Sequence, residues 1–279
     1  MRGSATESGG ERGGATITAA PAPVPPSPRR RRRRILLRLM RDLSLVMVIS
    51  GTLLLADAAA TLLWQEPLSA IIALIKQANL DERYLGYKHA PLSRLDLQAL
   101  SNLKQARQRV AFLARQEERV IKMGQAIGTI EFPTLSAQYI VVQGTAVGDL
   151  EKGPGHYPQT ALPGLQQTVA IAGHRTTYLA PFRRINELKP GNQIVLTMRY
   201  GRFTYAVQHT QVVTPTSWWI IKNHGYDRLV LSACNPLYSA AQRIVVFARL
   251  QSFVPLGPAQ VASTGHTLWW QLQHVFVSG

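Results

Sequence analysis

The chain has 279 residues, of which 46% are hydrophobic, and this length allows one or two domains. Its net charge of +16 would suit a nucleic-acid binder, but half of that excess lies in residues 1–41, which hold 10 Lys and Arg and 2 acidic residues. Residues 126–279 hold 11 basic and 5 acidic residues without a basic stripe, which argues against a phosphate-backbone partner. The single cysteine, Cys234, excludes an intramolecular disulfide.

Residues 1–34 are predicted to form a disordered, basic cytoplasmic tail. Residues 1–28 are rich in Gly, Ser, Ala and Pro and have almost no large apolar side chains. Arg29–Arg34 form a six-arginine run of the kind also found in nuclear signals and RNA-binding tracts. Because an apolar segment follows directly, we interpret the run as the flank of a membrane anchor.

Residues 35–64 are predicted to form a transmembrane helix. From Leu43 to Trp64 the segment has one charged residue, Asp57, and its length as a helix is roughly 33 Å, enough to cross a bilayer core. Positive charge before the span predicts a single-pass type II protein of the cell membrane, with its C-terminal part extracytoplasmic. A cleavable signal peptide ending near Ala58–Ala60 is the alternative, but the 41-residue prefix favours an uncleaved anchor.

Residues 65–124 are predicted to form a helical stalk or an appendage packed on the following domain. Apolar residues from Leu97 to Val120 recur at spacings of three and four or their multiples, and charged residues occupy the other face. A partner-binding coiled coil is the alternative, although the repeat does not extend over enough heptads.

Residues 125–252 have the pattern of a mainly β domain, followed by a tail at residues 253–279. Short β-branched and aromatic runs are separated by turn residues, which predicts a closed or nearly closed eight-stranded β-barrel with short helical insertions. The predicted strands are residues 128–132, 137–142, 168–172, 193–198, 202–209, 211–214, 228–232 and 243–250.

Three residues in this domain are candidates for chemistry. Cys234 ends an apolar run before Asn235-Pro236, where a strand should stop, and Arg243 begins the next run, so a thiol and a guanidinium could face each other across a cleft. His174 follows another apolar strand through Gly173 and could exchange a proton with the thiol. An inert buried cysteine is the alternative. No acidic residue lies near His174 in sequence, and Cys234 has no partner at metal-ligand spacing, so neither a carboxylate triad nor a metal site is predicted.

These residues stand in the segments IAGHR at 171–175, VLSAC at 230–234 and NPLYS at 235–239, with Arg243 at the start of the next run. Together these segments resemble those of the sortases, which are membrane-anchored cysteine transpeptidases. GPGHYP at 153–158 and TALPG at 160–164 are most similar to class E, with class D the near neighbour. The resemblance covers about Gly128 to Leu250.

The resemblance implies an eight-stranded sortase-type barrel and an enzyme without a cofactor. Cys234 would be the nucleophile, His174 the general acid and base, and Arg243 the residue that holds the substrate backbone and the oxyanion. The implied partners are secreted proteins with a C-terminal Leu-Ala-x-Thr-Gly or Leu-Pro-x-Thr-Gly signal, which is cut at Thr-Gly, and an amine on a cell-wall precursor or another protein.

Three further residues are implied to bind the substrate: Tyr157, Ala233 and Tyr238. Tyr157 matches a tyrosine that is linked to the Leu-Ala-x-Thr-Gly preference. Ala233 departs from the family pattern, because sortases usually have threonine before the cysteine. This departure motivates an alternative function, a catalytically weak binding or assembly protein at the cell surface.

Two other interpretations receive less support from the residues. L,D-transpeptidases also use Cys and His, but their arginine lies two residues after the cysteine and not nine. Val261–Gly265, VASTG, resembles a sorting signal in the chain's own tail, although short motifs of this kind often occur by chance.

Overall fold

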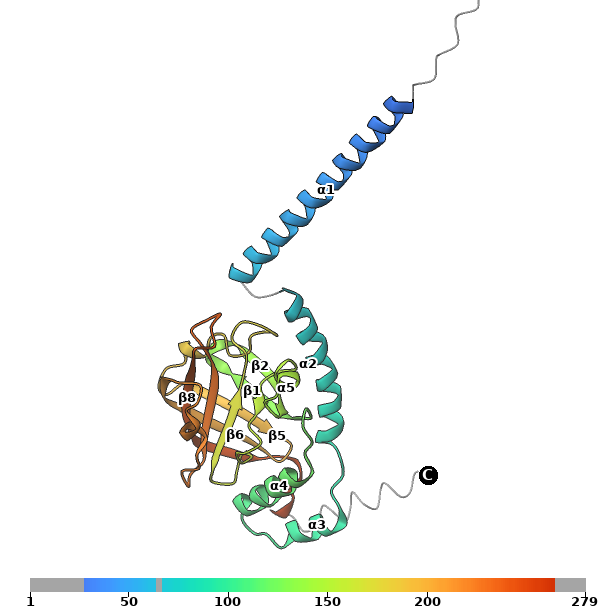
Figure 1. The fold of residues 1–279 in the computed structure, drawn as a ribbon. Helices are drawn as coiled ribbons and strands as arrows, with labels where there is room; N and C mark the ends of the chain where they lie inside the picture. Colours follow the sequence, from blue (N-terminus) through green and yellow to red (C-terminus); the bar gives the residue numbers. More distant parts are fainter. Residues whose placement is uncertain (1–27, 64–66, 264–279) are drawn as a thin grey trace, which may run out of the picture. The chain divides into compact units, whose positions relative to one another are not determined.

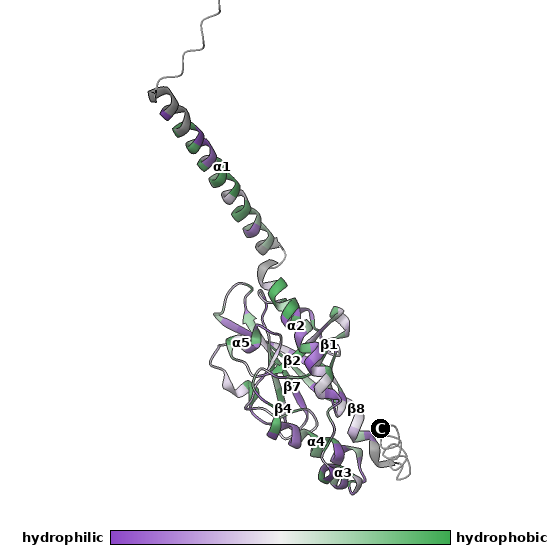
Figure 2. Cartoon of the chain, turned by 90° about the vertical axis from the view of Figure 1, so that its right-hand side faces the viewer, coloured by the Kyte–Doolittle hydropathy of each residue, from purple (hydrophilic) through white to green (hydrophobic). Residues whose placement is uncertain are grey.

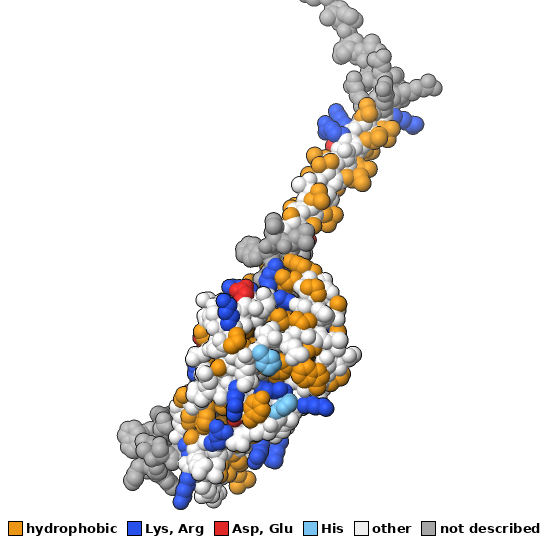
Figure 3. Space-filling model, turned by 90° about the vertical axis from the view of Figure 1, so that its left-hand side faces the viewer, with side chains coloured by type: hydrophobic (Ala, Val, Ile, Leu, Met, Phe, Trp, Pro, Cys, Tyr) orange, Lys and Arg blue, Asp and Glu red, His pale blue; other side chains and the backbone are white. Residues whose placement is uncertain are grey.

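The computed structural model describes residues 28–63 and 67–263. Helix α1 (Pro28–Leu63) contains a 25-residue stretch, Leu36–Ala60, that is long and apolar enough to cross a membrane. Its aliphatic side chains are exposed, and basic residues lie near its N-terminal end (Figure 3). The predictions for residues 1–27, for Trp64 and for residues 264–279, including the end of the VASTG sequence, lie outside the described residues.

Three helices precede the barrel, in the region where the spacing of apolar residues predicts helix. They are α2 (Pro67–Lys88), α3 (Arg94–Ser101) and α4 (Ala106–Val120). Leu80 and Tyr84 of α2 pack on Ala126, Ile140 and Val142 at the side of the barrel. Helix α4 lies across one end of the barrel (Figure 1), where its apolar residues join the main core. These helices are therefore packed against the barrel.

Eight strands form a closed barrel in the order β1-β2-β3-β4-β7-β8-β6-β5. Their bounds are β1 Ala126–Phe132, β2 Ala137–Gln143, β3 Gly155–His156, β4 Thr168–Ala172, β5 Gln193–Met198, β6 Gly201–Val213, β7 Arg228–Asn235 and β8 Gln242–Pro255. The pairs β2–β3 and β4–β7 are parallel, and the others are antiparallel.

Short helical insertions connect the strands. They are η1 (Pro133–Leu135), α5 (Val147–Leu150), η2 (Ile185–Glu187), η3 (Trp218–Ile221) and η4 (Gly257–Ser263). The closed eight-stranded barrel with short helices that the sequence predicts is thus confirmed. Two details differ, because the predicted strands 202–209 and 211–214 are one continuous strand, β6, and the two-residue strand β3 was not predicted.

Strand periodicity divides the barrel residues between an inner and an outer face. On β7 the side chains of Leu229, Leu231 and Ala233 belong to the main core, whereas Val230 belongs to a separate outer cluster. This outer cluster also contains Ala170, Ile220, Val245 and Phe247. Because side chains alternate along a strand, Cys234 lies on the same outer face as Val230.

Candidate active site

The three predicted catalytic residues border one open cleft on the outer face of the barrel. The cleft has a volume of about 290 Å³, and its walls come from the ends of β4 and β7, the start of β8, and η3. Cys234, His174 and Arg243 line it together with Tyr157. His174 and Cys234, which are 60 positions apart in the chain, therefore line the same cleft.

The barrel register holds Cys234 opposite Arg243. The two residues are Cα partners in the antiparallel pair of β7 and β8. Directly opposite residues point to the same face, with β-carbons about 5 Å apart. The Cys234 thiol is free and half-buried, and Nη1 of Arg243 donates to the carbonyl oxygens of Ala240 and Gln242, both at 2.9 Å. A thiol and a permanent cation thus share the mouth of the cleft.

His174 follows β4 on a loop that is anchored to the nucleophile strand. The Gly173 amide donates to the Ser232 carbonyl at 3.0 Å, and the Phe182 amide donates to the His174 carbonyl at 2.9 Å. A β-carbon on Gly173 would lie 2.6 Å from the ring of Phe182, which is fully buried. Glycine is therefore required before the histidine, because any side chain would collide with this ring.

Burial controls the protonation of His174. Its Nε2 is buried and has no hydrogen-bond partner within residues 28–63 and 67–263. Desolvation lowers the pKa of the imidazole, and the negative charge of Glu151 partly opposes this effect. At neutral pH the ring is therefore mostly neutral, in the form that can accept a proton.

Helix α2 contacts the surroundings of this histidine through Glu151 and Tyr178. Lys76 Nζ lies 2.6 Å from Glu151 Oε2, and the Tyr178 hydroxyl donates to Glu151 Oε1 at 3.2 Å. The Tyr178 ring lies 5.3 Å from the His174 ring, between centroids. The hydrogen bond from Lys76 lowers the pKa of Glu151, which keeps this carboxylate ionised. A carboxylate thus influences His174, although none is near it in sequence.

The loop after His174 has an unusual backbone. Tyr178, Leu179 and Ala180 are three successive residues with positive φ, at 50°, 65° and 41°. This left-handed conformation costs roughly 1–2 kcal/mol for each non-glycine residue. The Tyr178 amide donates to Ser69 Oγ of α2 at 3.2 Å, and the Ala180 amide donates to the Thr177 carbonyl at 2.8 Å. Contacts with α2 therefore help to hold this strained loop.

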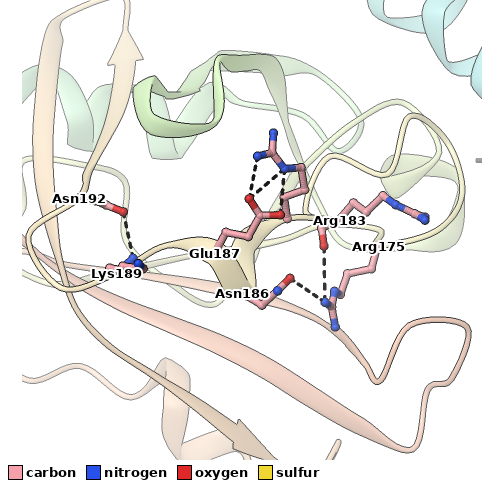
Figure 4. Close-up of polar contacts among 7 residues, drawn as sticks. Arg175, Arg183, Asn186, Glu187, Lys189 and Asn192 are labelled. Carbon is pink, nitrogen blue, oxygen red and sulfur yellow. Dashed lines mark hydrogen bonds and ion pairs between the residues drawn. The ribbon is translucent and has the colours of Figure 1, made fainter. Parts of the chain in front are cut away.

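Arg175, the residue after the histidine, connects the histidine loop to the nucleophile strand. Its side chain is buried, and Nη1 donates to the Cys234 carbonyl at 3.2 Å and to Asn235 Oδ1 at 3.0 Å. Nη2 donates to Asn186 Oδ1 at 3.0 Å (Figure 4). Arg175 thereby connects the two segments that carry the candidate acid-base group and nucleophile.

The residues implied to bind substrate have different positions. Tyr157 lines the cleft and packs on the outer cluster. Ala233 also borders the cleft, but its methyl group belongs to the main core inside the barrel. Tyr238 is not among the residues that line the cleft, and its hydroxyl accepts a hydrogen bond from Arg183 Nη2 at 3.3 Å. Tyr238 thus contacts the histidine loop.

Sequence reasoning missed most of the supporting residues. Arg175 stands in a motif to which the resemblance assigns no role for it, and Glu151, Lys76 and Ser69 are too distant from His174 in sequence for a local pattern to indicate them. Trp218 and Ile220 of η3 also line the cleft. Their signal was a run of large apolar residues in a predicted loop. Within the described part of the chain, no group of three His, Cys, Asp or Glu residues could hold a metal ion.

Comparison with known proteins shows that the barrel domain is similar to sortases. A family model for the sortase domain matches residues 130–251. Sortase D of Bacillus subtilis (strain 168) is 36% identical over 130 residues, which make up 45% of this chain and 64% of that protein. Sortase SrtE1 of Streptomyces coelicolor is 28% identical over 143 residues, which make up 46% of this chain and 41% of that protein. The chain thus spans less than two thirds of the length of these relatives.

A solved structure of sortase E from Streptomyces avermitilis is also similar. It is 31% identical, with a TM-score of 0.44, and the match covers 53% of this chain and 99% of that one. The relatives include sortases named D and E1, so the family is clear while the branch within it is not distinguished.

Proposed function

Because this chain belongs to the sortase family through its residues 130–251, we propose that it is a membrane-anchored cysteine transpeptidase. The observation that carries the proposal is the pairing of Cys234 with Arg243 in a cleft that His174 also lines. A thiol, a proton acceptor and a fixed cation are the groups that acyl transfer through a thioester requires.

The proposed substrate is the C-terminal sorting signal of a secreted protein, of the Leu-Ala-x-Thr-Gly or Leu-Pro-x-Thr-Gly type. Cys234 gives its proton to His174 and attacks the carbonyl carbon of threonine, which forms the carbon–sulfur bond. Arg243 stabilises the oxyanion, and when the carbon–nitrogen bond breaks, His174 returns the proton to the departing glycine amine. The product of this half-reaction is a thioester on Cys234.

An incoming amine then resolves the thioester. It comes from a cell-wall precursor or another protein, and it loses a proton to His174 as it attacks. Collapse of the second tetrahedral intermediate breaks the carbon–sulfur bond, and the proton returns to the sulfur. His174 thus ends each cycle in the neutral state that burial favours.

The proposed location follows from α1. Its apolar stretch Leu36–Ala60 would anchor the protein, with the arginine-rich end in the cytoplasm and the barrel outside. Secreted substrates emerge at this membrane surface, so an anchor there would bring enzyme and substrate together.

The test is formation of a covalent adduct. Purified protein is incubated with peptides of both signal types, and intact mass is measured with and without an added amine. We expect an acyl adduct on the wild type, none on Cys234→Ala, and its release by the amine. Wild-type protein that binds the peptides but forms no adduct with either would instead favour the binding or assembly function that Ala233 motivates.

A further inference from the structure

The exposed side of α2 changes character along its length. In its first half the large exposed side chains are aliphatic, namely Ile71, Ile72, Leu74 and Ile75, which are 47–59% exposed. No charged residue occurs between Pro67 and Ile75. In the second half the exposed residues include Asp81, Glu82 and Arg83. The green colour of the first turns of α2 in Figure 2 shows the apolar half.

The opposite side of the same helix is fixed to the barrel. Ala73, Leu80 and Tyr84 are buried, and Gln77 accepts a hydrogen bond from the Ile140 amide at 2.9 Å. Lys76 adds its ion pair with Glu151. The helix therefore cannot rotate to bury its isoleucines, and four large aliphatic side chains remain exposed on two adjacent turns. Exposed apolar residues grouped in this way indicate a contact surface.

The chain itself indicates what this surface contacts. Three residues separate Leu63, the last residue of α1, from Pro67. Four extended Cα steps reach at most about 14 Å, so the apolar turns of α2 begin close to the end of the candidate span. A helix with an apolar side and a polar continuation suits the boundary between headgroups and acyl chains, where apolar side chains enter to about 5–10 Å.

We propose that the first half of α2 is a membrane-binding surface, whose isoleucines and Leu74 insert into the lipid bilayer that anchors the protein. The proposal rests on the membrane anchor in the proposed function. Ser69 on this helix accepts a hydrogen bond from Tyr178 of the histidine loop, and Lys76 pairs with Glu151, to which the Tyr178 hydroxyl donates, so insertion would also hold the cleft at a fixed distance from the lipid.

Site-specific labelling of the full chain tests this surface. In a Cys234→Ala background, single cysteines replace Ile71, Ile75, Arg83 and, within the span, Leu53, and each is labelled with an environment-sensitive fluorophore. The proteins are reconstituted in vesicles of phosphatidylcholine and phosphatidylglycerol. Quenching is measured with spin-labelled lipid and with aqueous iodide.

We expect a blue-shifted emission and quenching by the spin-labelled lipid at Ile71→Cys, Ile75→Cys and Leu53→Cys, and quenching by iodide at Arg83→Cys. Iodide quenching at positions 71 and 75, with lipid quenching at 53, would overturn this inference and leave the anchor intact. Protection from both quenchers at 71 and 75 would also overturn it, because protein would then cover these turns. Iodide quenching at all four positions would overturn the anchor, and the inference with it.

Discussion

Replacement of Arg175 by methionine removes the hydrogen bonds that connect the histidine loop to the nucleophile strand. Three acceptors lie within 3.2 Å of the guanidinium: the Cys234 carbonyl and the side chains of Asn235 and Asn186. A hydrogen bond from a charged group contributes about 1.5–3 kcal/mol. The two asparagine side chains can turn towards solvent, so we expect Arg175→Met to lower the unfolding free energy by about 3 kcal/mol, which is less than the sum for three such bonds.

The matched control is Arg184→Gln in the same loop. Arg184 pairs with Glu187 at 2.7 Å, and both side chains are about half exposed. Surface pairs of this kind contribute little to stability. Both variants lose one positive charge, so the comparison isolates burial and hydrogen bonding.

The assay is guanidinium-induced unfolding in detergent, followed by tryptophan fluorescence, together with the rate of thioester formation. Arg175→Met should lower the guanidinium concentration at the unfolding midpoint strongly and should slow thioester formation, because the end of β7 loses its support. Arg184→Gln should change neither the midpoint nor the rate. Equal midpoints for the two variants would refute the role assigned to Arg175.

Three further predictions concern His174 and a buried carboxylate. Gly173→Ala should lower the unfolding free energy by about 1–3 kcal/mol, because Phe182 must move; an unchanged unfolding midpoint would show that the site tolerates a β-carbon. Glu151→Gln should move the rise of kcat/KM with pH to lower pH, because loss of the negative charge lowers the pKa of His174 further; a shift to higher pH would contradict this. Burial raises the pKa of Glu117 from 4.5 to about 7. Between these two pH values the folded state keeps a proton that the unfolded chain loses, so the free energy of unfolding should fall as the pH rises from 4.5 to about 7. Glu117→Gln should remove this slope in unfolding curves measured at several pH values, and equal slopes for variant and wild type would refute the assignment.

The strands were predictable where a run of β-branched residues is bounded by turn residues in the local sequence. The predicted strands 168–172 and 193–198 agree with β4 and β5 because β-branched runs are bounded there by turn residues. Strand β3 has two residues and owes its place to pairing with β2 and β4, so no local pattern could indicate it. The predicted division of β6 near Thr210 is wrong, because pairing with β8 continues through a register shift between Val207 and His209.

The candidate site was predictable for a related reason. Cys234 and Arg243 lie at the ends of neighbouring strands, so the expectation that they face each other needed only strand pairing, and the register confirms it. Glu151 and Lys76 lie 23 and 98 positions before His174, and their approach depends on how α5 and α2 pack. Such contacts arise from tertiary structure alone, which is why sequence reasoning found no carboxylate near the histidine.

The backbone positions of Cys234 and Arg243 depend on the pairing of β7 with β8 and not on the loop that connects these strands. Eight residue pairs along β7 and β8 fix the backbone positions of the two residues, whereas the loop at residues 236–241 supplies the Ala240 carbonyl that accepts a hydrogen bond from Arg243. Exchange of this loop between related proteins should therefore leave the two residues opposite each other while changing the surface beside the cleft. The connection between β7 and β8 is thus a natural graft point for altering recognition without rebuilding the barrel.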